Sequence, residues 1–145
     1  MKTHKITTQE DLQKAFDIRV KVFVEEQKVP AEEEIDQFDH LGGECHHILV
    51  TDDEDQAVGT GRIRLVEGVG KIQRVAILEE YRKLGLGRVI IQALEDIASK
   101  ELGASKVKLD GQVQAQGFYE KLGYHVASDI FLDAGIEHVL MIKAV

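Results

Sequence analysis

The sequence predicts an α+β, or mixed α/β, fold in which strands dominate the first half and helices alternate with strands in the second. Short β-branched runs bounded by turn residues fill residues 46–77, and two stretches with apolar residues every three or four positions indicate amphipathic helices. This order is typical of a sheet covered by helices. With 145 residues and 43% hydrophobic content the chain can bury one core, and no linker divides it, so we expect one domain over residues 1–145.

The first half is expected to contain one helix among several strands. Lys2–Ile6 predicts a short strand, and Thr8 is typical of a helix N-cap with Asp11 in the first turn. The apolar face of that helix comprises Leu12, Ala15, Phe16, Arg19, Val20 and Phe23. The polar stretch Glu25–Gly43 is expected to be irregular. The remaining strands are a hairpin of His46–Thr51 and Gln56–Val66 around Asp52–Asp55, and, after a turn at Gly68–Gly70, the central strand Lys71–Ile77.

The second half opens with a long amphipathic helix, Val89–Leu102, which Gly103 is expected to end. Its buried stripe is predicted to consist of Val89, Ile90, Ala93, Leu94, Ile97 and Ala98. A strand, Ser105–Leu109, and a short helix, Ala115–Leu122, follow. Tyr124–Phe131 and Glu137–Lys143 are predicted to complete the sheet.

Composition excludes several classes of protein. The single cysteine, Cys45, cannot form an internal disulfide, which is typical of a reducing, cytoplasmic setting. No apolar run approaches the roughly 20 residues of a membrane span, and no apolar segment follows the N-terminus as in a secretion signal. The formal net charge of -8 argues against nucleic acid as a partner, because such domains usually carry a basic face.

The segment Gln73–Arg88 carries the most specific chemical signal. A β-branched run stops at two acids, a basic turn with two glycines follows, and the long helix comes next. Free N–H groups and the helix dipole at a helix N-terminus both favour phosphate. Because Arg82, Lys83 and Arg88 concentrate positive charge in an acidic chain, this turn predicts a specific anionic ligand.

Three glycine-rich motifs could hold that ligand. A dinucleotide fingerprint needs a third glycine where this chain has Ile90, and a phosphate loop of the Walker type fails because Gly70-Lys71 is followed by Ile72 and a strand pattern. The third motif, Arg/Gln-x-x-Gly-x-Gly/Ala, is matched by Arg82–Gly87. This loop resembles the coenzyme A pyrophosphate loop of the GNAT superfamily of acyl-CoA-dependent N-acyltransferases.

Other segments extend the resemblance over almost the whole chain. Phe118–Tyr124 matches a second GNAT element at the expected distance downstream. Three further segments, Val22–Gln27, Pro30–Asp36 and Phe131–Ile136, look like the YjcF/ElaA branch of small bacterial GNAT proteins. The resemblance implies a single GNAT-type domain whose mostly antiparallel sheet has splayed middle strands and is flanked by helices. It also allows a homodimer.

The same resemblance implies an N-acetyltransferase that moves an acetyl group from acetyl-CoA to an amine. Val75 and Ile77 would pair through their backbone with the pantetheine arm, and Ala76 is small enough for close approach. The phosphates would lie on Arg82, Lys83, Leu84, Gly85, Leu86, Gly87 and Arg88. Gln112 stands where many relatives have the shorter Asn, which leaves that contact with the cofactor in question. Tyr119 is a further cofactor contact.

The catalytic roles follow from the chemistry of thioester aminolysis. A backbone N–H at Ile77 would stabilise the oxyanion, and the phenol of Tyr119, protonated at pH 7, would donate a proton to the departing thiolate. The general base is left open among Glu26, Asp110, His47, His138 and a water near Arg74. Taken alone, Tyr119 would be a buried tyrosine packed beside Phe118; the match to the family favours the catalytic role.

Three further features are open to two interpretations. Cys45, His46 and His47 suggest a metal, but neighbouring side chains on a strand point to opposite faces, so we expect no metal site. The acids Glu25, Glu26, Glu32, Glu33, Glu34 and Asp36 either steer a cationic amine or form a solvated loop. The alternatives to the enzyme are a non-catalytic acyl-CoA-binding or sensing module and a nucleotide-binding protein.

Overall fold

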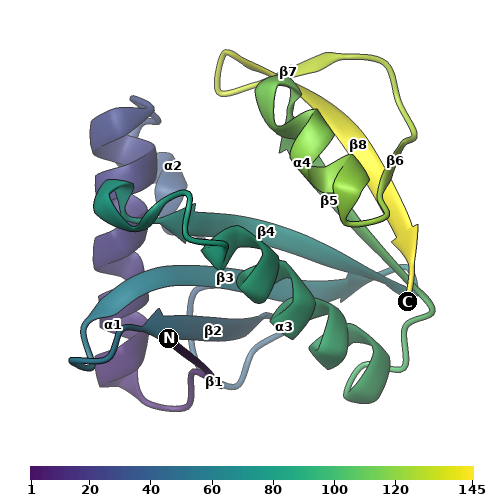
Figure 1. The fold of residues 1–145 in the computed structure, drawn as a ribbon. Coiled ribbons are helices and arrows are strands. Elements are labelled where there is room, and N and C mark those ends of the chain that lie inside the picture. The colour runs from purple at the N-terminus through teal and green to yellow at the C-terminus, as the bar shows by residue number, and fades with distance from the viewer.

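The computed structural model describes residues 1–145 and forms an open, mixed sheet of eight strands with helices on both faces (Figure 1). The strands are β1 (Lys2–Lys5), β2 (His46–Thr51), β3 (Ala57–Val66), β4 (Val69–Ile77), β5 (Lys106–Gln112), β6 (His125–Val126), β7 (Phe131–Asp133) and β8 (Ile136–Ala144). Their order is β1-β2-β3-β4-β5-β8-β6, with β7 also paired to β8. Only β4 and β5 run parallel, which confirms the α+β class and the mostly antiparallel sheet.

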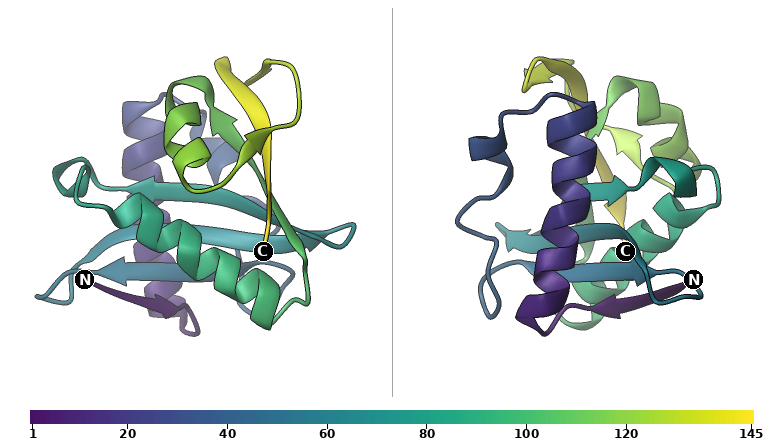
Figure 2. Two further views of the ribbon diagram at one scale, coloured as in Figure 1. Left: turned by 45° about the vertical axis from the view of Figure 1, so that its right-hand side comes forward. Right: turned by 90° about the vertical axis from the view of Figure 1, so that its left-hand side faces the viewer.

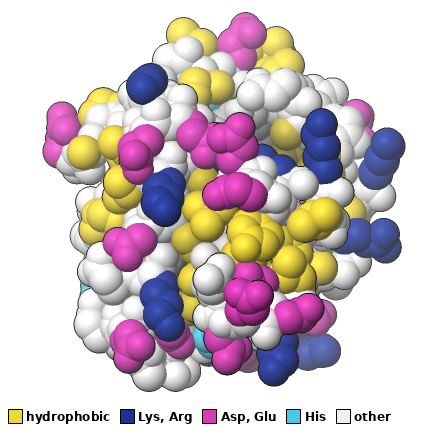
Figure 3. Space-filling model, turned by 60° about the vertical axis from the view of Figure 1, so that its left-hand side comes forward, with side chains coloured by type: hydrophobic (Ala, Val, Ile, Leu, Met, Phe, Trp, Pro, Cys, Tyr) yellow, Lys and Arg dark blue, Asp and Glu magenta, His cyan; other side chains and the backbone are white.

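Two long helices cover opposite faces of this sheet (Figure 2). On one face lies α1 (Gln9–Arg19), which continues as a π-helix, η1 (Val20–Glu26), and is followed by the short α2 (Ala31–Glu34). On the other face lie α3 (Leu86–Lys100) and α4 (Gln116–Lys121), preceded by the 3₁₀ turns η2 (Glu79–Tyr81) and η3 (Val113–Ala115). None of the helices combines the length and the apolar content of a membrane span. On the face shown in Figure 3, acidic side chains surround a central apolar patch, and basic side chains gather along one edge.

The π-helix changes which residues of the first helix are buried. Thr8 caps α1 as predicted, its hydroxyl accepting from the Asp11 N–H at 3.2 Å. The i→i+5 hydrogen bonding of η1 then widens each turn and shifts the phase of the apolar face. Val22 is buried, whereas Val20, which the helical period placed on the buried face, is 38% exposed. The regular structure also extends through Glu26 and resumes in α2, so the prediction of an irregular Glu25–Gly43 was wrong in these parts.

Helix α3 begins three residues earlier than predicted, at Leu86. Gly85 is its N-cap and has a left-handed φ of 81°, so Gly87 and Arg88 belong to the first helical turn and not to a loop. The earlier start puts Leu86 and Ile91 in the core, whereas Val89, predicted to be buried, is 37% exposed. Gly103 follows the helix with a φ of 67°, as expected of a residue that ends it.

Three other boundaries differ from the predictions. β5 extends to Gln112, so Asp110 is a strand residue. The turn before β4 is Glu67-Gly68, both left-handed, because Val66 already pairs with Val69. The predicted strand Tyr124–Phe131 was wrong: only His125–Val126 pairs, and a separate short strand, β7, begins at Phe131. Tyr124 is buried in the core instead.

The two halves of the sheet separate after a brief contact between β4 and β5. The parallel pairing runs only from Gly70↔Val107 to Ile72↔Leu109, and beyond it the two strands diverge (Figure 1). In the same stretch β4 carries a bulge, since two residues, Arg74 and Val75, oppose the single Gly61 of β3. Arg74 has a φ of 57°, which is uncommon for a residue with a side chain. The splayed middle strands are thereby confirmed.

A buried ionic cluster joins α1, the segment Glu34–Asp39 and the diverging part of the sheet. Arg19, 1% exposed, donates to Glu34 Oε2 at 2.9 Å and to both oxygens of Asp39 at 2.7 and 2.9 Å. Arg62, also 1% exposed, donates to Asp36 and Asp39 at 2.8–2.9 Å. Arg74 Nε lies 3.2 Å from Glu34 Oε2. The buried acids of this loop are thus neither solvated nor free to steer a ligand.

Burial and pairing act in opposite directions on these carboxyls. Burial alone would raise the pKa of Asp39, but the hydrogen bonds from Arg19 and the charge of Arg62 hold this pKa far below its usual range. Burial outweighs the arginines at Glu34, whose pKa is raised. The pairing of Asp39 therefore stabilises the fold above the ordinary carboxyl pKa and is lost as the pH falls toward its depressed folded value.

We predict that Arg19→Met destabilises the domain by leaving Glu34 and Asp39 buried without their partner. Removing one member of a buried ion pair costs about 3–5 kcal/mol. The free energy of unfolding in urea is the measurement. Lys14→Met is the control, because Lys14 forms only exposed pairs at 3.6 and 3.8 Å and should change stability by less than about 0.5 kcal/mol. Equal effects of the two substitutions would contradict the structural role of the cluster.

Candidate functional site

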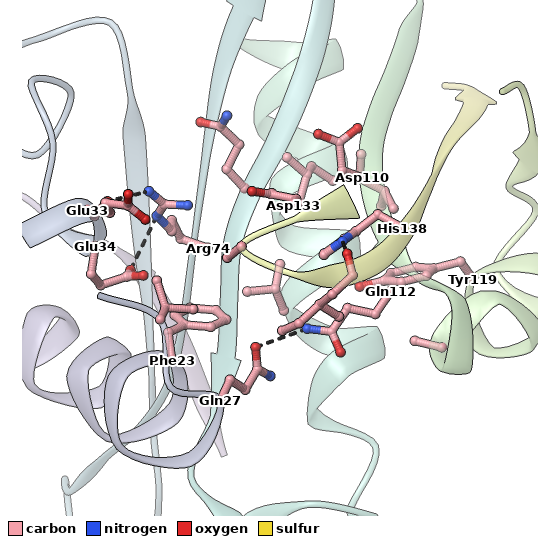
Figure 4. Close-up of a pocket in the computed structure, with 18 residues that line it drawn as sticks. Phe23, Gln27, Glu33, Glu34, Arg74, Asp110, Gln112, Tyr119, Asp133 and His138 are labelled. Atoms are coloured by element: carbon pink, nitrogen blue, oxygen red, sulfur yellow. Dashed lines mark hydrogen bonds and ion pairs between the residues drawn. The ribbon is translucent and has the colours of Figure 1, made fainter. Parts of the chain in front are cut away.

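A cavity of about 370 Å³ lies where β4 and β5 diverge. Figure 4 shows Glu33, Glu34 and Arg74 on one wall and residues of β5, β7, β8 and α4 on the other. The polar groups that line it are Gln27, Glu33, Glu34, Gln73, Arg74, Asp110, Gln112, Tyr119, Asp133 and His138. The cavity is therefore lined by candidate functional residues from both halves of the sheet. They meet at one cavity because β4 and β5 diverge there.

The cavity reaches both faces of the sheet. Side chains alternate along a strand, so Leu109 and Gly111 of β5 face α3 and α4, whereas Asp110 and Gln112 face the side of α1. Tyr119 belongs to the first face, because a Cβ on Gly111 would lie 3.1 Å from its ring. His138 of β8 pairs with Gln112 and so belongs to the second face. A molecule in this cavity would thus be contacted from both sides of the sheet.

The free edge of β4 leads from the cavity toward the basic loop. The Leu78 N–H donates to the Val58 carbonyl of β3 at 3.0 Å. Because hydrogen-bonding directions alternate along a strand, the N–H and C=O of Ile77 point away from β3, to the side from which β5 has departed. The Ile77 carbonyl accepts from Arg82 Nε at 3.0 Å. Val75 lines the cavity, and Ala76 is buried against α1.

The basic loop presents several unpaired N–H groups. The backbone N–H groups from Lys83 to Arg88 donate to no acceptor of the chain, whereas Val89 N–H bonds to the Gly85 carbonyl at 3.3 Å. Lys83 and Gly85 both have left-handed φ values, 66° and 81°, which turn successive N–H groups the same way. These free donors sit at the N-terminus of α3, an arrangement that favours an anion.

The two glycines of this loop serve different purposes. Gly85 is left-handed, and nothing lies within 4 Å of the Cβ it lacks. Gly87 is in the helix, and a Cβ there would lie 3.0 Å from the Phe118 ring. Gly85 therefore sets the turn, whereas Gly87 lets α3 and α4 approach each other.

Tyr119 is held by packing and not by hydrogen bonds. Its ring meets Phe118 and Tyr124 edge-on, with centroids 5.2 and 6.1 Å apart, and rests on Gly111. Its hydroxyl has no hydrogen-bond partner in the chain and lines the cavity. Burial raises the pKa of Tyr119, so the phenol stays protonated near neutral pH and can donate.

The structure separates the candidates for a base. Glu26 lies outside the cavity lining and accepts from Arg82 through both oxygens, at 2.9 Å each, which counts against a role as base. His47 is buried away from the cavity, with Nε2 donating to the Phe38 carbonyl at 3.4 Å. Asp110 and His138 do line the cavity, and so does Arg74, although its guanidinium is paired with Glu34.

Gln112 and Gln27 connect the two sides of the divergence. Gln112 Nε2 donates to Gln27 Oε1 at 3.0 Å (Figure 4). Gln27 follows η1 directly, so this bond ties the end of β5 to the first helix. The sequence singled out Gln112 for the site. Gln27, Phe23 and Asp133 lie in segments that resemble the YjcF/ElaA branch, but the sequence assigned them no place in the site, because their position in the lining depends on contacts between distant segments. No group of three His, Cys, Asp or Glu side chains is placed to hold a metal ion.

Comparisons with known proteins agree with this architecture. Residues 8–145 match the family model described as an acetyltransferase (GNAT) domain. YjcF of Bacillus subtilis, an uncharacterized N-acetyltransferase, is 48% identical over 136 residues, covering 93% of this chain and 94% of its own. A crystal structure of an acyl-CoA N-acyltransferase from Pseudomonas aeruginosa superposes with a TM-score of 0.85 at 28% identity, covering 99% of this chain and all of the other. Escherichia coli ElaA has the same fold, with a TM-score of 0.86 at 24% identity over 98% of each chain.

We predict that Gly85→Val weakens the binding of coenzyme A at least tenfold while the domain stays folded. A β-branched residue at a φ of 81° costs roughly 1–2 kcal/mol and re-orients the N–H groups of the turn. Gly68→Val is a matched control, because Gly68 has a φ of 82°, has open space around it, and lies at the opposite end of β4. Calorimetric titration of both variants is the measurement. Unchanged affinity in a folded Gly85→Val protein would rule out this loop as the phosphate site.

Proposed function

The chain belongs to the GNAT acetyltransferase family, and on that premise we propose that it transfers an acetyl group directly from acetyl-CoA to an amine. One observation carries the proposal: the free edge of β4 runs from the cavity to the unpaired N–H groups at the start of α3. An extended arm with a thioester at one end and phosphates at the other fits such a track. Acetyl-CoA enters this reaction as the acyl-donor substrate.

The donor is proposed to bind from the side of α3 and α4. Its pyrophosphate would accept hydrogen bonds from the N–H groups of residues 83–88, with charge from Lys83 and Arg88, both exposed and without ion-pair partners. Arg82 is engaged with Glu26 and Ile77, so it would support the loop as well as add charge. The pantetheine arm would pair with β4 at Val75 and Ile77 as an added strand and pass Gln112.

The chemical step needs a nucleophilic nitrogen, a stabilised oxyanion and a proton for sulfur. The neutral amine nitrogen attacks the thioester carbon and the oxygen gains charge. The nitrogen then releases one proton to solvent, and the C–S bond breaks. The Ile77 N–H, directed toward the free edge of β4, is the proposed donor to the oxyanion. The Tyr119 hydroxyl, which has no partner in the chain, would give its proton to the departing sulfur and regain one from solvent.

The acceptor is proposed to enter from the side of α1 and α2. Three carboxylates lie along that part of the lining and are exposed: Glu33 on α2, Asp110 on β5 and Asp133 on β7. Of these, only Asp110 has an ion-pair partner, Lys71, at 3.9 Å. Unpaired carboxylates favour a cationic ligand. This charge supports an amine that arrives as an ammonium ion.

We predict that the protein binds acetyl-CoA more tightly than ATP and consumes the thioester in the presence of an accepted amine. Calorimetry with both ligands tests binding, and release of free thiol across a panel of primary amines tests turnover. Equal affinity for ATP and acetyl-CoA would contradict the proposed donor site. Tight binding of acetyl-CoA without turnover of any amine would favour a non-catalytic acyl-CoA-binding module.

Tyr119→Phe is expected to lower turnover by about 10²–10⁴-fold and to leave the affinity for acetyl-CoA nearly unchanged. The ring keeps its contacts with Phe118 and Gly111, and only the proton donor is lost. Steady-state rates at saturating acetyl-CoA are the measurement. Tyr124→Phe is the control: its hydroxyl donates to Glu95 at 2.7 Å, outside the cavity lining, so its loss should affect stability and not rate. Wild-type turnover in Tyr119→Phe would mean that another group protonates the sulfur.

A further inference from the structure

An alkylammonium acceptor must lose a proton before it can attack, so the reaction needs a group that takes this proton. At pH 7 only roughly one alkylamine in a few thousand is neutral, given a reference pKa of ~10.4. The inference rests on the proposed function, because it assigns a residue to that reaction. A base must line the cavity on the acceptor's side and carry a free lone pair.

Pairing or burial removes Glu26, Glu34 and Asp110 from consideration. Glu26 is engaged by Arg82 outside the cavity. Glu34 lines the cavity but is 2% exposed, and its Oε2 is shared by Arg19 and Arg74. Asp110 is exposed at the rim and lies within ion-pair distance of Lys71. Arg82 and Lys71 occupy the carboxylates of Glu26 and Asp110. The pKa of Glu34 is raised, but burial keeps its carboxyl out of reach of an incoming amine. Glu33 and Asp133 line the cavity without ion-pair partners, but both are exposed and no contact fixes their carboxylates as the ring of His138 is fixed.

His138 has a fixed orientation and one free nitrogen. The ring is 8% exposed and stacks on Phe131, with centroids 6.0 Å apart and planes at 22°. Nδ1 lies 2.7 Å from the Ile136 carbonyl oxygen. Since a carbonyl oxygen can only accept, Nδ1 must carry the hydrogen, and in the neutral ring the lone pair is on Nε2. Nε2 has no hydrogen-bond partner in the chain, and the residue lines the cavity.

The sheet places His138 and Tyr119 on opposite faces of β5, and therefore on opposite sides of the cavity in which the acetyl group would be transferred. His138 pairs with Gln112 across β5 and β8, whereas Tyr119 packs on Gly111, whose place in the strand faces the other way. The proton of an incoming ammonium and the proton needed by a departing thiolate are also on opposite sides of the acyl carbon. The cavity, lined by both side chains, connects the two.

We propose that His138 is the general base of the transfer and accepts the ammonium proton of the acceptor at Nε2. The N–H bond of the acceptor breaks, an Nε2–H bond forms, and the imidazolium then releases the proton to solvent through the exposed rim. The hydrogen bond to Ile136 and the stack on Phe131 fix the ring for this step. The charged and titratable groups that share the cavity with the ring are Asp110 from β5, Asp133 from β7, Glu33 and Glu34 from α2, Arg74 from β4 and Tyr119 from α4.

Two amines of different basicity test the proposal with one variant, His138→Gln. The first, 1,5-diaminopentane, is an ammonium ion at pH 7 and needs a base. The second, methoxyamine, is neutral at pH 7 and needs none before attack. We expect His138→Gln to lower kcat/KM for diaminopentane about 10²–10⁴-fold and to change kcat/KM for methoxyamine by less than about threefold. Acetyl-CoA affinity, measured by calorimetry, checks that the variant is folded.

The wild-type pH profile gives a second measurement that needs no variant. With diaminopentane, kcat/KM should rise with pH and level off well below the amine's own pKa of ~10.4, because the base and not the free amine then limits proton removal. With methoxyamine, which is already neutral, kcat/KM should not show this rise with pH. A profile that rises continuously to the pKa of the amine would overturn the role of His138.

The remaining outcomes distinguish the two proposals. An equal loss with both amines would make His138 a structural residue, and no loss with either would exclude it as the base; each overturns this inference alone. Acetyl-CoA that stays intact with wild-type protein across the whole panel of primary amines and with methoxyamine overturns the proposed function, and the role of His138 falls with it.

Discussion

The buried cluster of Arg19, Arg62 and Arg74 with Glu34, Asp36 and Asp39 is the interaction on which the site depends. It joins α1 to the loop Glu34–Asp39 and joins both to β3 and β4. Such a cluster contributes little net stability, since desolvation offsets most of the attraction, but it cannot be partly dismantled without leaving a buried charge. Because the cluster resists partial disruption, it can hold the α1–α2 side of the cavity in one position. One side of the cavity is therefore fixed by charge pairing, whereas the other is fixed by the strand pairing of β5, β7 and β8.

The bulge at Arg74 connects this wall to the divergence of the sheet. A left-handed φ of 57° costs energy for a residue with a side chain, and it persists because the guanidinium is held by Glu34 and Asp36. The extra residue bends β4 away from β5 just past Ile72, where their pairing stops. The ion pairs of Arg74 thus maintain its strained backbone, and the resulting bulge produces the free edge of β4. It leaves backbone groups unpaired in the middle of a sheet, where they face a cavity instead of a neighbouring strand.

The sequence predicts those parts of the structure that are encoded locally. Gly85 signals the left-handed turn before α3, Thr8 signals the start of α1, and alternating apolar residues identify β2 to β4, so the fold class and the loop could be predicted. The ion pairs could not, because they join residues as far as 40 positions apart, Glu34 and Arg74, and the sequence shows only an acidic stretch. The left-handed Arg74 and the π-helical turn leave no mark in composition. The general base could not be chosen from the sequence for a related reason. The orientation of His138 depends on its stack with Phe131, which begins β7 and does not end a strand from Tyr124 as predicted.

The opening in the sheet also explains how acid and base chemistry can be kept apart in a small domain. Aminolysis of a thioester removes a proton from one reactant and delivers a proton to the other. If the base lay next to the acid, the acid would pass its proton to the base, and neither group could serve its reactant. Alternation along β5 avoids this, because Gly111 and Gln112 face opposite ways and each adjoins a different titratable side chain. Tyr119 is set in an apolar row of aromatic rings that keeps its proton, whereas His138 lies among carboxylates that favour an arriving cation. A continuous sheet would separate the two faces completely, so the early end of the β4–β5 pairing is what would let the proposed acid and the proposed base act on one carbon atom.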